Sequence, residues 1–455
     1  GGKMQIISNK EELISANGEK AELILKMLEA GIKSVLPSEI VPKKISRADG
    51  FLTIGSKEIS WPTRGDVYVF GTGKASASLA AELYKIVGEE IKKGLVITDD
   101  KQEKGHIGPI RVENGGHPVP NQSGLKAAKK IKDIALEMEE GDLGLCLISG
   151  GGSSLMSLPV KNIPLQDLIK TNELLIKCGA NIVEINTVRK HLSQLKGGNL
   201  ARSIHPGEVV SIIISDVVGN DPKNIASGPT AADPTTFGDA MGIFEKYDLE
   251  ETLPSSVYDY VSQSTKISSR ETVKPEEFSS FQVSNQLIAE NLTAMEAIKD
   301  VADNRNLNSL ILSSMIEGDS RHTGKILGTL GKSIVTEQKP IEPPGVIISG
   351  GETTVKISKD GNGGPNQELV LGGKKEIEGL SELSIASLDT DGKDGNSKYA
   401  GGLLTGKEFT DEQTIDWQKA MKNHCSSDFL EKEHGAIFTG LTGTNVNDIR
   451  IVLAL

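Results

Sequence analysis

Two segments of the sequence are almost alike, and the residue types in both suit the binding of phosphate. Residues 147–154 read Leu-Ile-Ser-Gly-Gly-Gly-Ser-Ser, and residues 347–354 read Ile-Ile-Ser-Gly-Gly-Glu-Thr-Thr. Each is an apolar run, typical of a buried strand, that stops abruptly in glycines. Backbone N–H groups at such a stop can surround an anion because no bulky side chain blocks its approach. The two segments therefore predict phosphate-binding loops at strand ends, formed by Ser149, Gly150, Gly151, Gly152, Ser153, Ser154 and Glu352.

A shorter glycine loop, Gly71-Thr72-Gly73-Lys74, follows the strand-like residues 66–70 and precedes an alanine-rich stretch typical of a helix. Its spacing is too short for a Walker A loop. It also lacks the third glycine of a dinucleotide fingerprint, because position 76 is serine. The backbone here could still approach an anion, and Lys74 could supply a positive charge. The alternative is a tight turn that carries a surface lysine.

Aspartates follow two further predicted strands. Asp216 and Asp221 come after one of them, and Asp389 and Asp391 come after the other. Carboxylates at a strand end suit Mg²⁺ that is held together with the phosphates of a nucleotide. An EF-hand is excluded, since the position of its closing glutamate is Ala400. The alternative is that these aspartates cap turns and helix starts.

The densest basic group lies in residues 186–196 and contains Arg189 and Lys196. Such a group could hold the carboxylate of a substrate or the phosphates of a nucleotide. The alternative is a solvated helix face. The amide side chains of Asn220, Asn366 and Gln367 are further candidates for contact with the ligand.

The composition favours small-molecule chemistry. Aromatic residues make up only 4% of the chain and the net charge is −12, which argues against nucleic acid as a partner. Three widely spaced cysteines and the lack of a CxxC pair indicate a reduced, cytoplasmic protein without a thiolate metal site. No apolar run approaches the roughly 20 residues of a membrane span, so no membrane partner is expected.

Strands and helices alternate along the chain at βα spacing, which predicts an α/β fold with mostly parallel sheets flanked by helices. With 455 residues the chain is too long for one ordinary core. The polar residues 250–280 are the expected junction, which gives domains at 4–270 and 280–455. In the second domain we expect a strand at 281–283 and a helix that begins near residue 285. Ligands bind beyond the carboxyl ends of strands in such sheets, where the polar clusters fall.

Taken together, these motifs resemble the glycerate 2-kinase family, whose C-terminal part is called the MOFRL domain. The resemblance covers about residues 66–402 and rests on residues 71–76, 115–120, 148–154, 186–198, 215–230, 349–354, 363–368 and 389–395. It implies ATP-dependent phosphorylation of D-glycerate at C2, which gives 2-phospho-D-glycerate and ADP, with Mg²⁺ or another divalent cation. It also implies a Rossmann-like N-terminal α/β domain, a MOFRL-type C-terminal α/β domain and an active site in the cleft between them.

The resemblance also assigns roles to residues. The lysine of the first glycine loop, here Lys74, is expected to be catalytic. An arginine that often follows the late Gly-Gly of relatives is replaced by Pro365, for which Arg189 and Arg321 are candidate substitutes. Asn220 stands where aspartate is frequent, so an oxygen ligand is kept but a charge is lost.

Our mechanistic hypothesis is that the loop at 150–152 binds the phosphates of ATP. Mg²⁺ is expected among Asp216, Asp221 and Asp389, and Asp216 or Asp391 is expected to accept the substrate proton. Two other functions stay open: a hydroxypyruvate reductase of small hydroxy acids, and a non-catalytic sensor of an anionic metabolite. The expected assembly is a monomer or a homodimer.

Overall fold

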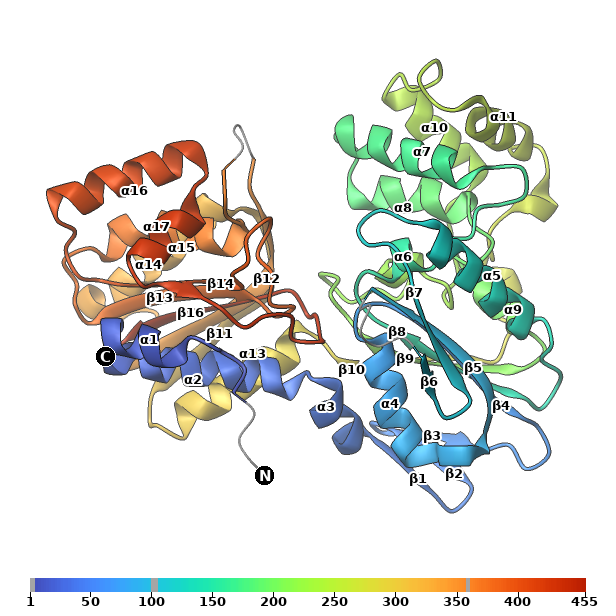
Figure 1. The fold of residues 1–455 in the computed structure, drawn as a ribbon, viewed down its shortest axis with the longest axis horizontal. Coiled ribbons are helices and arrows are strands. Elements are labelled where there is room, and N and C mark those ends of the chain that lie inside the picture. The colour runs from blue at the N-terminus through green and yellow to red at the C-terminus, as the bar shows by residue number, and fades with distance from the viewer. Residues whose placement is uncertain (1–4, 100–104, 357–360) are drawn as a thin grey trace. The chain divides into compact units, whose positions relative to one another are not determined.

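The computed structural model describes residues 5–99, 105–356 and 361–455. These residues form two compact units. The central unit comprises Ile40–Ile288, and the terminal unit contains residues 5–39 and 289–455 (Figure 1). The expectation of two α/β domains is confirmed, but the chain enters the terminal unit twice. In the described part of the chain, no helix combines the length and the apolar character that crossing a membrane requires.

The central unit is built on a largely parallel sheet. Its strands, in spatial order, are β10 (Val283–Ala289), β9 (Glu208–Ile214), β8 (Leu143–Ile148), β4 (Val67–Thr72), β5 (Ile91–Thr98), β7 (Ile110–Asn114) and β6 (Gly105–Ile107). The pairs β9–β8, β8–β4, β4–β5 and β5–β7 are parallel, whereas β6 is antiparallel to β7. Strands β4 and β8 are buried at every residue, as a sheet covered on both faces requires.

Helices complete the central unit. They are α4 (Ser76–Val87), α5 (Gln122–Ala135), α6 (Gly152–Leu155), α7 (Leu165–Lys177), α8 (Ile182–His191), α9 (Asn199–Ile204), α10 (Phe237–Lys246), α11 (Ser255–Ser264) and α12 (Pro275–Phe278). One apolar core joins α5 and α9 to the sheet, and a second joins α7, α8, α10 and α11. Figure 1 shows these four helices grouped away from the sheet. A small antiparallel sheet of β1 (Ile45–Ala48), β2 (Phe51–Ile54) and β3 (Lys57–Ser60) follows α3 (Pro37–Lys44).

The terminal unit has a mixed sheet. Its spatial order is β11 (Asn308–Asp319), β12 (Gly345–Thr354), β16 (Asp448–Ala454), β13 (Leu383–Asp389), β14 (Gly401–Thr405) and β15 (Ala436–Ile437). Strands β11 and β12 are parallel, but β12–β16, β16–β13, β13–β14 and β14–β15 are antiparallel. The expected parallel arrangement therefore holds for the central sheet and is corrected here. The reason is that the C-terminal strand β16 inserts between β12 and β13, a pairing that local sequence patterns do not reveal.

Helices cover both faces of the terminal sheet (Figure 1). They are α1 (Lys10–Asn17), α2 (Glu19–Ser34), α13 (Asn291–Asp303), α14 (Ser320–Glu337), α15 (Pro365–Ile377), α16 (Asp411–Asn423) and α17 (Ser426–Lys432). Helices α1 and α2 lie within residues 4–270, the range expected for the first domain, but they belong to the terminal unit. The observed division of the chain therefore differs from the expected one. Helix α2 packs closely on α13 and β16. A Cβ at Gly31 would lie only 3.1 Å from side chains of Ile298 and Ile449. The spacing of apolar residues along such a helix does not reveal which core receives its apolar face.

Two local expectations in the terminal half are also wrong. The strand expected at 281–283 is β10, which begins at Val283, and the helix expected from residue 285 is α13, which begins at Asn291. The second glycine segment is not a loop, because Gly350, Gly351 and Glu352 lie inside β12 and pair with neighbouring strands. The glycines serve close packing there, since a Cβ at Gly350 would lie 1.7 Å from Asn291 Oδ1.

Close packing of α14 against α15 gives a first prediction. A Cβ at Gly324 would lie 1.9 Å from the carbonyl oxygen of Leu369. We expect Gly324→Ala to lower the free energy of unfolding of the terminal unit by about 2 kcal/mol. Fluorescence of Trp417, whose indole N–H donates to the Leu371 carbonyl at 3.0 Å, reports this in urea titrations.

The matched control is Gly242→Ala on α10, where an added Cβ meets nothing within 4 Å. This change removes conformational freedom from the unfolded chain and is expected to be neutral or slightly stabilising. Equal effects of the two changes would contradict the proposed close packing of α14 on α15.

Candidate active site

Three neighbouring parallel strands bring the main candidate residues of the central unit to one edge of its sheet. Lys74 follows β4, the segment 149–154 follows β8, and Asp216 follows β9. The spatial order is β9-β8-β4, and both pairs are parallel, so all three carboxyl ends lie at the same edge. The strand-end placement predicted from the sequence is therefore confirmed for this unit.

Hydrogen bonds join the loop after β4 to the loop after β8. The Lys74 N–H donates to the Gly150 carbonyl at 2.9 Å, and the Ala75 N–H donates to Ser149 Oγ at 3.0 Å. Gly73 has φ +125°, and a Cβ there would lie 2.2 Å from Ser149 Oγ. Glycine is therefore required at position 73. Ser149 is buried and positions the Lys74 loop, and its contact with a ligand stays a prediction.

Asp216 and Lys74 pack against adjacent glycines of the loop after β8. A Cβ at Gly150 would lie 2.1 Å from Asp216 Oδ2. A Cβ at Gly151, whose φ is +79°, would lie 3.5 Å from Lys74 Cγ and 2.9 Å from His117 Cδ2. Only the lack of side chains lets the carboxylate and the lysine stem approach the loop so closely. We call Lys74, Gly150, Gly151 and Asp216 the glycine-loop site.

Two backbone donors of this site are free to bind a ligand. Across the described part of the chain, no acceptor is found for the N–H groups of Gly150 and Gly151, although Gly150 is buried. Buried N–H groups are rarely left unpaired in folded proteins. An anion at the glycine-loop site would satisfy both of them and would lie beside the lysine.

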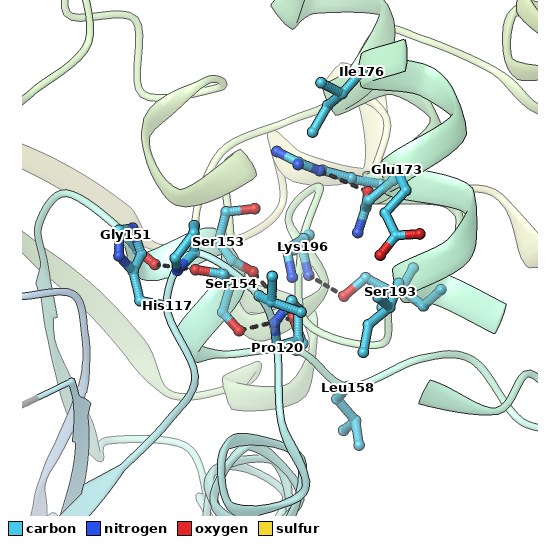
Figure 2. A pocket seen from close by; sticks show the side chains of 17 residues that line it. His117, Pro120, Gly151, Ser153, Ser154, Leu158, Glu173, Ile176, Ser193 and Lys196 are labelled. Carbon is cyan, nitrogen blue, oxygen red and sulfur yellow. Dashed lines mark hydrogen bonds between the residues drawn. The ribbon is translucent and has the colours of Figure 1, made fainter. Parts of the chain in front are cut away.

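A pocket of about 350 Å³ adjoins this site and is called the central-unit pocket. Figure 2 shows His117, Gly151 and Ser153 on one side, Glu173 and Ile176 on the other, and Lys196 between them. Aliphatic side chains supply much of the lining. They include Val119, Leu158, Leu168, Ile169 and Ile176. A few polar groups in a mostly apolar cavity are typical of small-molecule sites.

Ser153 and Ser154 both line this pocket. Ser153 Oγ lies 2.8 Å from Ser227 Oγ, and Ser227 Oγ donates to Asn186 Oδ1 at 3.0 Å. Ser227 has therefore used its only hydrogen, so Ser153 donates to it and offers a lone pair toward the pocket. Ala226 and Ser227 have φ of +50° and +60°, a costly conformation for residues with side chains. The sequence analysis gave this strained segment and His117 no role, and only the family resemblance pointed to them.

Arg189 and Lys196 line the same pocket. The Arg189 Nε–H donates to Asn172 Oδ1 at 2.9 Å, and Lys196 Nζ donates to the Met156 carbonyl at 3.0 Å. Burial, together with the smaller effect of the nearby Arg189 charge, lowers the pKa of Lys196 to about 7. Burial also lowers the pKa of Arg189. A solvated helix face is excluded for Lys196, which is 3% exposed.

The remaining candidates after β9 lie in the loop that follows Asp216. Asn220 has φ +55°, which asparagine tolerates, and its N–H donates to the Val217 carbonyl at 3.0 Å. Asp221 forms an ion pair with Lys223 at 3.1 Å and accepts the Lys223 N–H at 3.0 Å. Throughout residues 5–99, 105–356 and 361–455, no three His, Cys, Asp or Glu side chains gather as a metal cluster.

The candidates of the terminal unit lie around the end of β13. Asp389 Oδ1 accepts the Asp391 N–H at 3.0 Å, and Asp391 Oδ1 accepts the Lys393 N–H at 2.8 Å. Both aspartates therefore cap the turn, which is the structural alternative raised for them. Glu352 is exposed on β12 opposite Glu317. Whether these residues contact a ligand stays a prediction.

Asn366 and Gln367 are buried within the terminal unit, and their contact with a ligand stays a prediction. Asn366 Nδ2 donates to Asp394 and Asp448, and its Oδ1 accepts from Ser387. Gln367 Nε2 donates to Asp394 at 2.9 Å, and its Oε1 accepts from Ser427 at 2.6 Å. These amides are occupied in the core, so they hold the turn of residues 389–395 in place.

Pro365, which stands where the family resemblance led us to expect an arginine, also has a structural role. Pro365 begins α15, where a missing N–H costs nothing. Arg321, one of the expected substitutes, is engaged by Glu368, the Met421 carbonyl and His424. Arg321 is thereby fixed within the terminal unit, whereas Arg189 faces the central-unit pocket.

The buried carboxyl of Asp394 predicts a pH dependence of stability. Burial raises the pKa of Asp394 from its ordinary value of 3.8 to about 7, and the Asp448 carboxylate adds to the rise. The folded unit thus keeps a proton that the unfolded chain releases above about pH 4. The resulting stabilisation is complete below that pH and is lost as the pH rises through about 7, by at most roughly 1.4 kcal/mol per pH unit.

Urea titrations in a Trp61→Phe background, where Trp417 is the remaining indole, measure how the free energy of unfolding differs between about pH 5 and about pH 8. We expect the Asp394→Asn variant to be less stable than the wild type at both pH values. Its free energy of unfolding should also lose the part of the pH dependence that comes from Asp394. An unchanged slope in the variant would mean that Asp394 is not the titrating group.

Comparisons with known proteins identify the family. The model of a domain of unknown function, DUF4147, matches residues 23–262, and the MOFRL family model matches residues 345–448. The chain is 40% identical to a glycerate 2-kinase from Pyrococcus horikoshii, with 95% of this chain and 97% of that protein covered. It is 38% identical to an Agrobacterium vitis protein that carries the name hydroxypyruvate reductase, over 86% and 87% of the two chains.

A solved structure agrees. The crystal structure of glycerate kinase from Thermotoga maritima is similar with a TM-score of 0.81 and 32% identity, over 95% of this chain and 99% of that one. The likeness therefore spans both units. The chain belongs to the glycerate 2-kinase family, in which a DUF4147 domain is followed by a MOFRL domain.

Proposed function

We propose that this chain transfers the terminal phosphoryl group of ATP to the C2 hydroxyl of D-glycerate, which yields 2-phospho-D-glycerate and ADP. The observation that carries the proposal is the glycine-loop site. It places a lysine, a carboxylate and two unpaired N–H groups within one small region, at the edge of the central sheet where the carboxyl ends of its strands lie. Phosphoryl transfer depends mainly on positioning and on stabilisation of charge, and this site supplies both.

Each group of the site has a proposed role. The N–H groups of Gly150 and Gly151 bind phosphate oxygens, and Lys74 neutralises charge on the group in transfer. The C2 oxygen of glycerate attacks the γ-phosphorus, and the bond to the β–γ bridging oxygen breaks, so its electron pair leaves with ADP. The Asp216 carboxylate accepts the hydroxyl proton. Asp391 of the terminal unit remains the second candidate for this proton.

A divalent cation, Mg²⁺ in this proposal, fits the oxygen donors present. Mg²⁺ is commonly held by one or two carboxylates together with substrate phosphates, so a cluster of three protein ligands is not needed. Asp216 would hold it at the glycine-loop site, and Asp221 and Asp389 are the other carboxylates proposed for it. When bound, the ion supplies positive charge that offsets the charge of the phosphates.

The proposal is tested by ADP release from ATP with D-glycerate as acceptor, measured with and without the acceptor. A hydroxypyruvate reductase would instead consume NADH with hydroxypyruvate, which absorbance at 340 nm detects. A sensor would bind glycerate or ATP without forming ADP. The kinase proposal fails if ADP release does not depend on D-glycerate.

We also propose that the enzyme acts in the cytoplasm as a monomer or a homodimer. The three cysteines, Cys146, Cys178 and Cys425, are free thiols, which supports a reducing compartment. Sedimentation equilibrium would distinguish the two assemblies.

A further inference from the structure

We propose that Arg189 and Lys196 form a two-cation subsite in the central-unit pocket that binds the carboxylate of the acceptor. The subsite would make the enzyme prefer hydroxy acids over their uncharged analogues. This inference rests on the proposed kinase function and assigns a specificity role within it. For Lys196 it selects the substrate carboxylate over the nucleotide phosphates, which were the two ligands expected from the sequence.

Neither cation of the subsite has an acidic partner. Of the described carboxylates, none lies within 4.0 Å of Arg189 or Lys196, whose bonds go to an amide oxygen and a carbonyl. Two basic residues nearby in the sequence differ. Lys190 lies 3.4 Å from Asp233, and Arg202 lies 2.5 Å from Glu277. The cations that face the pocket are thus the ones left without a counter-ion.

Such an arrangement is costly without a ligand. A buried charge needs pairing, and an unpaired lysine tends to lose its proton instead. The lowered pKa of Lys196 reflects this cost, because burial and the like charge of Arg189 both disfavour its charged form. An anionic ligand between the two cations would remove both penalties.

A hydroxyl group completes the subsite. Ser193 lines the pocket and is buried, and its Oγ accepts the N–H groups of Leu195 and Lys196, each at 3.2 Å. Within the described part of the chain its own hydrogen has no protein acceptor, so it can be donated to a ligand. Two cations and one hydroxyl donor match the two oxygens of a carboxylate.

The position of the subsite favours a carboxylate over phosphate. The reaction has two anionic reactants, and the pocket has two anion-binding ends, the glycine-loop site and this pair. The unpaired N–H groups and Lys74 at the first end suit phosphates. Arg189 and Lys196 share the pocket lining with the aliphatic side chains of Leu158 and Leu168, and in such surroundings a single charge is easier to desolvate than a polyphosphate with its metal.

The test compares D-glycerate with its amide, D-glyceramide, in the wild type, Lys196→Met and Arg189→Met. We expect the ratio of kcat/KM for the acid to that for the amide to fall at least tenfold in each variant, with KM for ATP changed less than threefold. Lys196→Arg should restore part of the preference, because it keeps the charge. The matched control is Lys170→Met on α7, an exposed lysine outside the pocket lining, which should leave the ratio unchanged.

Calorimetric titration of D-glycerate into the folded proteins without ATP gives a readout besides activity. Circular dichroism and thermal melting establish that each variant is folded. Weaker glycerate binding by Lys196→Met and Arg189→Met, but not by Lys170→Met, supports the subsite even if the wild type forms no ADP, a result that would remove the kinase function alone. An unchanged acid-to-amide ratio, or a rise in KM for ATP with KM for glycerate unchanged, would overturn the subsite.

Discussion

Replacing Lys74 by methionine is expected to lower kcat by about 100- to 1,000-fold. Methionine keeps an unbranched stem that can pack against Gly151 as the lysine Cγ does, so the change removes mainly the charge. Loss of a charged group that stabilises the group in transfer acts on the transition state, so kcat falls together with kcat/KM. Steady-state release of ADP at saturating ATP and D-glycerate measures the effect.

The matched control for Lys74 is Lys85→Met on α4, an exposed lysine whose ion pair with Glu82 lies on the surface. This variant should stay within about twofold of the wild type, because surface pairs contribute little. Turnover of Lys74→Met within tenfold of the wild type, roughly 1.4 kcal/mol, would contradict the catalytic role of Lys74.

Gly150→Ala is expected to have the second largest effect, a loss of about 100-fold in kcat. The new Cβ would lie 2.1 Å from Asp216 Oδ2, so the carboxylate must move away from the loop. A displacement of about 1 Å at a reacting group can cost this much rate. Kinetics of the folded variant, with Gly242→Ala as the control, measure the effect.

A double variant shows whether the effect passes through Asp216. In an Asp216→Ala background there is no carboxylate to displace, so adding Gly150→Ala should change kcat little further. Independent sites would instead give multiplied losses. Multiplied losses here would mean that Gly150 acts on something other than Asp216.

Much of the central-unit site was predictable from the sequence because it depends on local features. Polar residues directly after apolar runs identify strand ends, and parallel strands put their carboxyl ends at one edge. That reasoning placed Lys74, Gly150 and Asp216 correctly. The adjacency of β9, β8 and β4 was not predictable, since strand order depends on long-range packing.

The terminal unit shows where the same reasoning fails. The Ser-Gly-Gly pattern follows the end of β8 at Ile148 but lies inside β12 at Gly350, where glycine accommodates the Asn291 side chain. The burial of Asn366 could not be read from its polarity, because its partners Asp394 and Asp448 are distant in sequence. Polar residues near a glycine turn can therefore either face a ligand or support a core network.

The burial of Lys196 could not be predicted from the sequence, for a related reason. A lysine three residues before a helix start normally lies in solvent, and only the folded structure reveals that it faces a pocket next to Arg189. The sequence therefore identified the basic segment as a possible anion site, which stays a prediction, while the burial of Lys196 and the lack of counter-ions could be found only in the structure.

The reaction proposed for this chain is phosphorylation of D-glycerate at C2. Proton-coupled phosphorus NMR of the product formed from ATP and D-glycerate tests it directly. We expect a new phosphomonoester doublet, because the phosphorus couples to the single proton on C2. A triplet from the two protons on C3, or no phosphorylated glycerate at all, would contradict it.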